Sequence, residues 1–194
     1  MPHNNNNMDR QRKYAEMFGK GDLLELGCGR GDFMKICEEK GIKATGVDLT
    51  PGITADNIVE ADILQYLEEA KESSFEGVYA RHIIEHFSPR DLRRLIKGIK
   101  RVLKKEGKAV FITPDIRSLN VALYDFWNDP DHIRPYTADA VFKLCAEQGL
   151  EPVEAGSDRD TVKNDPLRFF VRKARYIFSG IKSYAPDLYI IVKK

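Results

Sequence analysis

The chain has 194 residues, of which 42% are apolar and 31% are charged, a balance typical of one globular domain. Lysine and arginine together number 31 and aspartate and glutamate 30, so the net charge of +1 excludes a protein that is basic throughout and binds nucleic acid over its whole surface. The sequence has no apolar run of about 18 residues and no charged-then-apolar leader, so we expect no membrane-spanning helix and a cytoplasmic protein.

The cysteines are Cys28, Cys37 and Cys145, an odd number without a Cys-x-x-Cys pair. This argues against a disulfide framework and a structural zinc site and favours a reducing compartment. We therefore expect three small buried side chains.

Residues 1–8, MPHNNNNM, are rich in asparagine, and we expect a disordered tail or tag there. Residues 9–194 are expected to form a single domain that opens with a short helix at 9–18. No internal repeat or linker indicates a second domain.

Short apolar segments then alternate with amphipathic ones, and each kind has its own periodicity. The pattern predicts strands at 22–29, 43–49, 58–62, 75–82, 108–115, 151–157 and 187–194, and helices at 32–41, 63–71, 89–107 and 138–149. Strands separated by helices indicate right-handed crossovers and a parallel sheet. The last two strands lack a clear crossover, so we expect one antiparallel strand near the edge. Segments 116–136 and 157–186 are expected to be substrate-side or covering segments.

A glycine-rich turn, ELGCGRGDF, follows the first predicted strand and precedes a helix. Glycines allow the backbone to turn sharply and approach a ligand, and the helix directs its positive end at that ligand. The spacing is G-x-G-x-G, not the G-x-G-x-x-G of dinucleotide-binding turns. Glu25 and Asp32 flank the turn, and they would repel a pyrophosphate but suit a cationic amine or sulfonium.

Acidic residues also end the next two strands. Asp48 follows Gly27 by 21 residues, at the end of the second strand. A carboxylate there can accept both hydroxyls of a ribose. Asp62, after the third strand, can reach an adenine amino group.

These segments together resemble the motifs of class I S-adenosylmethionine (SAM)-dependent methyltransferases, in the same order and spacing. The matching segments are ELGCGRGDF (25–33), GVDLT (46–50), ADI (61–63), FEGVYARHIIEHF (75–87) and VLKKEGKAVFITPD (102–115). The resemblance covers about residues 20–155. It implies an α/β, Rossmann-like fold with a seven-stranded, mostly parallel sheet, one antiparallel strand and helices on both faces. It also implies SAM as the cofactor.

The resemblance further implies the cofactor contacts. Glu25 is expected near the amino group of the methionine part, Asp48 at the ribose hydroxyls and Asp62 at the adenine amino group. The full implied set is Glu25, Gly27, Cys28, Gly29, Gly31, Asp48, Leu49, Asp62, Ile63 and Arg81. For the cofactor's carboxylate, the N-terminal helix offers Arg10, Arg12 or Tyr14.

The segment WNDPDHIRPY (127–136) is the most distinctive feature of the acceptor side. It resembles the D-P-x-H-x-R-P stretch of methyltransferases of cell-surface polysaccharides and related glycans, and more loosely the H-x-R-x-Y-T stretch of many small-molecule methyltransferases. We therefore expect acceptor contacts from Trp127, His132, Arg134 and Tyr136. His132 is a candidate general base, and Arg134 can hold a phosphate or carboxylate. The alternative is a structural loop whose His and Arg side chains bond backbone carbonyls.

His82, Glu85 and His86 form H-x-x-E-H, which superficially matches an inverted zincin motif. That motif belongs inside a helix with a further ligand downstream, whereas this one lies where a strand ends. We therefore expect no metal. His82 borders the expected methyl position and is a second candidate base.

The stretch 167–183 separates into an apolar and a basic face on a helical wheel. Such a helix covers a core, lies on an anionic membrane surface or contacts nucleic acid. The favoured interpretation is transfer of a methyl group to an oxygen of a small molecule or glycan. The alternatives are an RNA or protein methyltransferase that uses this helix, and a non-catalytic cofactor-binding module. The sequence does not indicate an oligomeric state.

Overall fold

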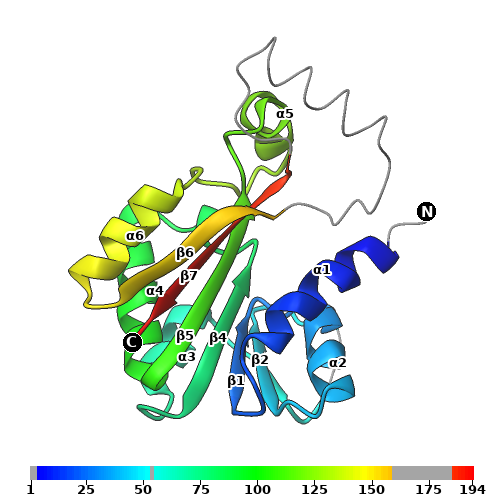
Figure 1. The fold of residues 1–194 in the computed structure, drawn as a ribbon, viewed down its shortest axis with the longest axis vertical. Coiled ribbons are helices and arrows are strands. Elements are labelled where there is room, and N and C mark those ends of the chain that lie inside the picture. Colours follow the sequence, from blue (N-terminus) through cyan, green and yellow to red (C-terminus); the bar gives the residue numbers. More distant parts are fainter. Residues whose placement is uncertain (1–3, 53–54, 159–184) are drawn as a thin grey trace.

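The computed structural model describes residues 4–52, 55–158 and 185–194, which form one sheet between two layers of helices (Figure 1). The strands are β1 (Leu23–Leu26), β2 (Ala44–Asp48), β3 (Ile58–Glu60), β4 (Phe75–Arg81), β5 (Leu103–Pro114), β6 (Glu151–Asp158) and β7 (Asp187–Lys193). The α-helices are α1 (Asn4–Glu16), α2 (Asp32–Glu39), α3 (Ile63–Glu69), α4 (Pro89–Val102), α5 (Leu119–Leu123) and α6 (Ala138–Glu147). Two 3₁₀ turns are η1 (Ile84–His86) and η2 (Asp125–Asn128).

The seven strands of the described residues lie in the order β3-β2-β1-β4-β5-β7-β6. Strands β1 to β5 pair in parallel, and β7 runs antiparallel between β5 and β6. The predicted mostly parallel sheet with one antiparallel strand is therefore confirmed. The strand order reverses between β1 and β4, and open α/β sheets bind ligands outside the carboxyl ends of strands at such a point.

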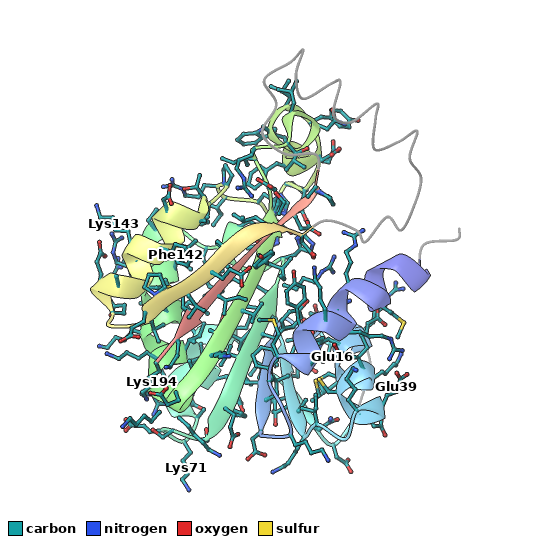
Figure 2. All side chains as sticks on the ribbon, in the orientation of Figure 1. Glu16, Glu39, Lys71, Phe142, Lys143 and Lys194 are labelled. Carbon is teal, nitrogen blue, oxygen red and sulfur yellow. The ribbon has the colours of Figure 1, made fainter. Side chains whose placement is uncertain are left out.

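Helices cover both faces of the sheet, as the sequence predicts. On one face, α1 and α2 pack their apolar side chains, including Phe33, onto Tyr79 of β4. On the other face, α4 buries its predicted stripe of leucine, isoleucine and valine with α3 and α6. Figure 2 shows charged side chains such as Glu16, Glu39 and Lys143 at the periphery. The apolar core therefore fixes the strands whose ends form the site.

Helix α4 begins as the sequence predicts but ends early. The Ser88 hydroxyl oxygen accepts a hydrogen bond from the Asp91 N–H, and Pro89 occupies the first turn. The helix was expected to reach residue 107 but stops at Val102. Leu103 is already extended and begins β5, although the side-chain pattern still suits a helix there, and Glu106 within β5 adopts a left-handed φ of 67°.

Other segments also differ from the expectation. Helix α1 begins at Asn4, inside the segment expected to be a tail, and segment 116–136 contains α5 and η2. Most of segment 157–186, including the basic stretch 167–183, lies outside the described residues. Among the helices that the structure describes, none combines the length and apolar character needed to cross a membrane.

The three cysteines are free and buried. Burial raises the pKa of the Cys28 thiol to about 11 and the pKa values of Cys37 and Cys145 to about 12. Because the thiolate is the reactive form, we expect the native protein at pH 8 to react with a thiol reagent far more slowly than the protein in guanidinium, where three thiols should titrate. Fewer than three thiols after unfolding, or fast labelling of the native protein, would contradict this.

Candidate functional site

The glycine-rich turn connects β1 to α2 at the carboxyl edge of the sheet. Gly27, Gly29 and Gly31 have left-handed φ values of 73°, 49° and 70°. A Cβ on Gly27 would lie 2.0 Å from Cδ1 of Ile83, so this position requires glycine for space as well as for conformation. A Cβ on Gly29 would meet no atom within 4 Å, so the turn leaves its backbone open to a ligand at that point.

Asp48, at the end of β2, ties this turn to the neighbouring strand. Its Oδ2 accepts from the Gly29 N–H at 2.8 Å and its Oδ1 from the Thr50 N–H at 2.9 Å. Each carboxylate oxygen keeps a further lone pair, and the side chain is only partly buried. Leu49 beside it is 65% exposed, which leaves an apolar surface next to the carboxylate.

Asp62 and Ile63 lie at the start of α3, where the next strand has ended. Asp62 caps the helix, because its Oδ1 accepts from the Gln65 N–H at 2.9 Å, and the residue is exposed. Ile63 is partly buried against the core. Cys28 differs from its neighbours, since its thiol is buried against the backbone of Gly46 and leaves only its main chain for a ligand.

Glu25, on β1, is the least satisfied polar group of this region. The residue is 5% exposed, and its Oε2 is buried without a hydrogen-bond partner. Burial, with repulsion from Asp32 and Asp48, raises the pKa of this carboxyl well above its usual value, although Arg81 opposes the shift. An unpaired buried carboxylate is costly. A ligand that brings an ammonium group would remove this cost, so the turn fits the predicted methionine part of SAM.

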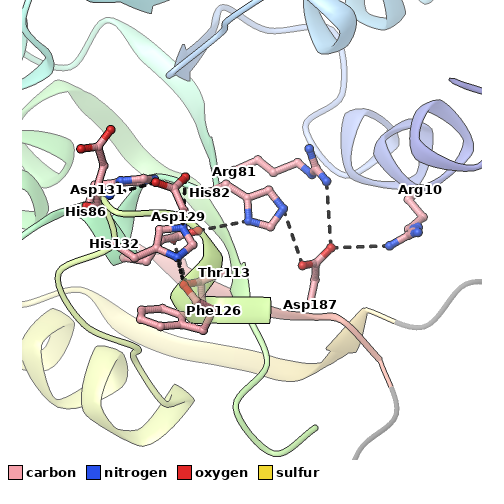
Figure 3. Close-up of polar contacts among 11 residues, drawn as sticks. Arg10, Arg81, His82, His86, Thr113, Phe126, Asp129, Asp131, His132 and Asp187 are labelled. Carbon is pink, nitrogen blue, oxygen red and sulfur yellow. Dashed lines mark hydrogen bonds and ion pairs between the residues drawn. The ribbon is translucent and has the colours of Figure 1, made fainter. Parts of the chain in front are cut away.

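A second group of charges lies at the end of β4 and is centred on Asp187 of β7 (Figure 3). Asp187 Oδ2 lies 3.5 Å from Arg10 Nη1 and 4.0 Å from Arg81 Nη2, and its Oδ1 lies 3.6 Å from His82 Nε2. Burial raises the pKa of the Asp187 carboxyl, while His82, Arg81 and Arg10 counteract the rise. Asp187 could not be predicted as a site residue from the sequence, because the antiparallel insertion of β7 brings it to this edge.

His82 is held in one orientation by two carboxylates. Its Nδ1 lies 3.1 Å from Oε1 of the fully buried Glu85, and Oε2 of Glu85 accepts from the Thr113 hydroxyl at 2.9 Å. His82 has a left-handed φ of 54°, and such strain costs about 1–3 kcal/mol and clusters at functional sites. The side chain remains 33% exposed, so a substrate can reach it.

The predicted acceptor residues divide into two groups. Trp127 is 62% exposed and Arg134 is exposed, with its guanidinium 5.0 Å from the centre of the Tyr136 ring. His132 is turned inward, with Nδ1 2.6 Å from the Phe126 carbonyl oxygen. Tyr136 is 2% exposed and donates its hydroxyl to the Phe87 carbonyl, so it holds the segment in place and does not face a ligand.

The N-terminal helix brings only part of its predicted set to the site. Arg10 joins Asp187, whereas Arg12 pairs with Glu39 of α2 on the outer surface. Burial, together with the nearby Asp158 carboxylate, raises the pKa of the Tyr14 hydroxyl. Arg10 is therefore the member of the predicted set that lies beside the charges at the end of β4.

A sequence model of the methyltransferase domain family matches residues 5–155. The chain belongs to this family. A SAM-dependent methyltransferase from Archaeoglobus fulgidus is 25% identical, with a TM-score of 0.80 over 96% of this chain and 92% of that chain. This methyltransferase therefore uses SAM as its cofactor, in agreement with the fit at Glu25. A search of curated proteins returned no match.

Two further solved structures share the fold at lower identity. A SAM-dependent methyltransferase from Mesorhizobium loti is 16% identical, with a TM-score of 0.67 over 96% of this chain and 100% of that chain. A phosphoethanolamine N-methyltransferase from Haemonchus contortus, in complex with SAM, is also 16% identical, with a TM-score of 0.67 over 96% of this chain but 52% of that chain. At this identity the two structures share the fold and do not define the acceptor of this methyltransferase.

The state of Glu25 generates a prediction about stability. Because its pKa is raised in the folded protein, the stabilisation from the neutral carboxyl is present below the ordinary carboxyl pKa and is lost as the pH rises toward the folded value. Glu25→Gln should therefore raise the melting temperature of the cofactor-free methyltransferase at pH 7.5, more than at pH 5, while weakening SAM binding. Thermal unfolding and calorimetry measure both effects.

The exposed Glu60 of β3 provides the matched control, and Glu60→Gln should change neither property. A destabilised Glu25→Gln variant at pH 7.5, or one with unchanged SAM affinity, would contradict the assignment.

Proposed function

We propose that this methyltransferase transfers the SAM methyl group to an oxygen of a small molecule or glycan that binds beside the end of β4. The observation that carries the proposal is His82, a partly exposed imidazole held between Glu85 and Asp187 next to the glycine-rich turn. A base is useful for a hydroxyl acceptor, whose proton must be removed during attack.

The proposed SAM contacts come from residues at the carboxyl edge of the sheet. Gly27, Gly29, Gly31 and the backbone of Cys28 line the methionine and ribose part. Asp48 accepts hydrogen bonds from the ribose hydroxyls with its remaining lone pairs, and the exposed Leu49 packs on the adenine. The remaining contacts come from Glu25 to the ammonium, Asp62 to the adenine amino group, Ile63 to the ring and Arg81 beside the methyl position.

On the acceptor side, bound SAM supplies a methyl group that its sulfonium has already activated. His82 Nδ1 faces Glu85, and Nε2 lies 3.6 Å from Asp187 Oδ1, which is longer than a hydrogen bond. Nε2 therefore receives the proton of the acceptor hydroxyl, and Asp187 stabilises the resulting charge. The exposed Arg134 and Trp127 offer a cation and an apolar face to the acceptor. The inward position of His132 leaves His82 as the better placed base.

Each rival function predicts a different binding or transfer result. An RNA or protein methyltransferase would use the basic stretch 167–183, which lies outside the described residues. Filter binding of RNA over a salt series tests it, because phosphate contacts produce a steep salt dependence. A non-catalytic module would bind SAM but transfer no methyl group to any acceptor class.

Asp48→Asn tests the ribose assignment. Hydrogen bonds to a charged carboxylate contribute about 1.5–3 kcal/mol, so the variant should bind SAM about 10–100-fold more weakly by calorimetry. The exposed Asp56 lies in the connection that follows, and Asp56→Asn should bind as the wild type does. Equal affinity in the Asp48 and Asp56 variants would refute the assignment.

His82→Gln tests the base. Removing a general base should slow methyl transfer about 10²–10⁴-fold and abolish its pH dependence, while SAM affinity stays near that of the wild type. The assay supplies radiolabelled SAM with a panel of sugars, nucleotide sugars and phenols, and with RNA and protein as competing acceptors. Label in RNA or protein, or unchanged turnover of the variant on a sugar or phenol, would overturn the proposal.

A further inference from the structure

A cluster of metal-ligating side chains lies beside His82, on the side away from Arg10 (Figure 3). Glu85 and His86 come from η1, and His132 comes from the segment between η2 and α6. One ligand atom of each residue lies within 4.8 Å of the others, and the two imidazole centres are 4.8 Å apart. The proposed methyl transfer uses neither His86 nor His132, so the cluster calls for a separate explanation.

Both histidines are held in the same tautomer. His86 Nδ1 lies 3.1 Å from the Asp131 carbonyl oxygen, and His132 Nδ1 lies 2.6 Å from the Phe126 carbonyl oxygen. A carbonyl only accepts hydrogen bonds, so each Nδ1 carries a hydrogen, and in the neutral imidazole Nε2 then keeps its lone pair. Metal-binding histidines almost always have such an outer partner, which fixes the ring and leaves the second nitrogen for the ion.

Carboxylates complete the set. Glu85 is fully buried, and its oxygens contact His82 Nδ1 and the Thr113 hydroxyl, which leaves lone pairs for an ion. Asp129 Oδ2 lies 3.8 Å from His132 Nε2, while Asp129 Oδ1 is held by the Asp131 N–H at 2.9 Å. Two neutral imidazoles with one or two carboxylates form a ligand set that suits first-row transition metals, whereas Mg²⁺ prefers oxygen ligands.

We propose that Glu85, His86 and His132 bind one divalent transition-metal ion. Such ions hold their ligands at about 2.0–2.2 Å, so the side chains need only a small movement inward. The site departs from the expectation of no metal, and it also differs from the H-x-x-E-H motif, because His82 is not one of its ligands and His132 comes from a later segment. Glu85 is a ligand of the proposed site and also contacts His82, so an open coordination position on the ion would bind an acceptor oxygen next to the base. This role in acceptor binding rests on the proposed function, whereas metal binding itself does not.

The test is a titration of the full chain with Co²⁺, Zn²⁺ and Mg²⁺, followed by calorimetry and, for Co²⁺, by visible absorption. All proteins carry His3→Ala, so that His82 is the one remaining histidine outside the proposed site. Neither SAM nor acceptor is present. We expect one equivalent of Zn²⁺ or Co²⁺ to bind and Mg²⁺ to bind far more weakly. His86→Gln and His132→Gln should each weaken binding by at least about 10–100-fold, the loss caused even by removing outer partners.

Asp131→Asn is the matched control, because Asp131 contacts His86 through its backbone carbonyl oxygen. The metal affinity of this variant should equal that of the His3→Ala parent. Thermal unfolding establishes that each variant is folded. Absence of saturable binding near one equivalent, binding that survives both histidine substitutions, or a preference for Mg²⁺ would overturn the proposal. Because the titration contains no SAM, its failure leaves the methyl-transfer proposal untouched, and an unchanged rate for His82→Gln leaves the metal site untouched.

Discussion

The buried carboxylate of Glu25 is the constraint on which the cofactor site depends. Its Oε2 has no hydrogen-bond partner, and Asp32 and Asp48 add negative charge around it. A site with this charge disfavours a diphosphate and favours an ammonium group. The left-handed glycines and the hydrogen bond from Gly29 to Asp48 shape the adjoining turn, where we propose that the nucleoside binds. The choice of SAM over a dinucleotide therefore depends on the negative charge around Glu25 as much as on the backbone shape of the glycine-rich turn.

The antiparallel strand gives the acceptor side its own constraint. β7 lies between β5 and β6, and its first residue, Asp187, pairs with Pro114 at the carboxyl end of β5. Asp187 therefore faces Arg10 of α1 and the consecutive residues Arg81 and His82 at the end of β4, which are far apart from it in the sequence. The same edge carries η1, so the imidazole of His82 and the Glu85 cluster are neighbours.

The sequence predicts those parts of the fold that depend on local pattern. Alternating strands and helices indicate the parallel sheet, and the Ser88 cap and apolar stripe of α4 identify its clearest helix. The local pattern extends α4 too far, because the side chains after Val102 still suit a helix although Leu103 already belongs to β5, and it does not reveal that α1 begins at Asn4. The positions of Glu25, Asp48 and Asp62 at one edge of the sheet could be predicted, because they lie at or just past the carboxyl ends of parallel strands. Asp187 and the inward turn of His132 and Tyr136 could not, because long-range pairing determines them.

The most direct test of the central claim compares S-adenosylhomocysteine, which carries the ammonium, with 5′-methylthioadenosine, which lacks it. Calorimetry on the wild type and on Glu25→Gln measures the affinity of each ligand. The account predicts that the wild type favours S-adenosylhomocysteine and that this advantage shrinks in the variant. If neither nucleoside binds, or if the advantage is the same in both proteins, then Glu25 does not serve the ammonium and the account is wrong.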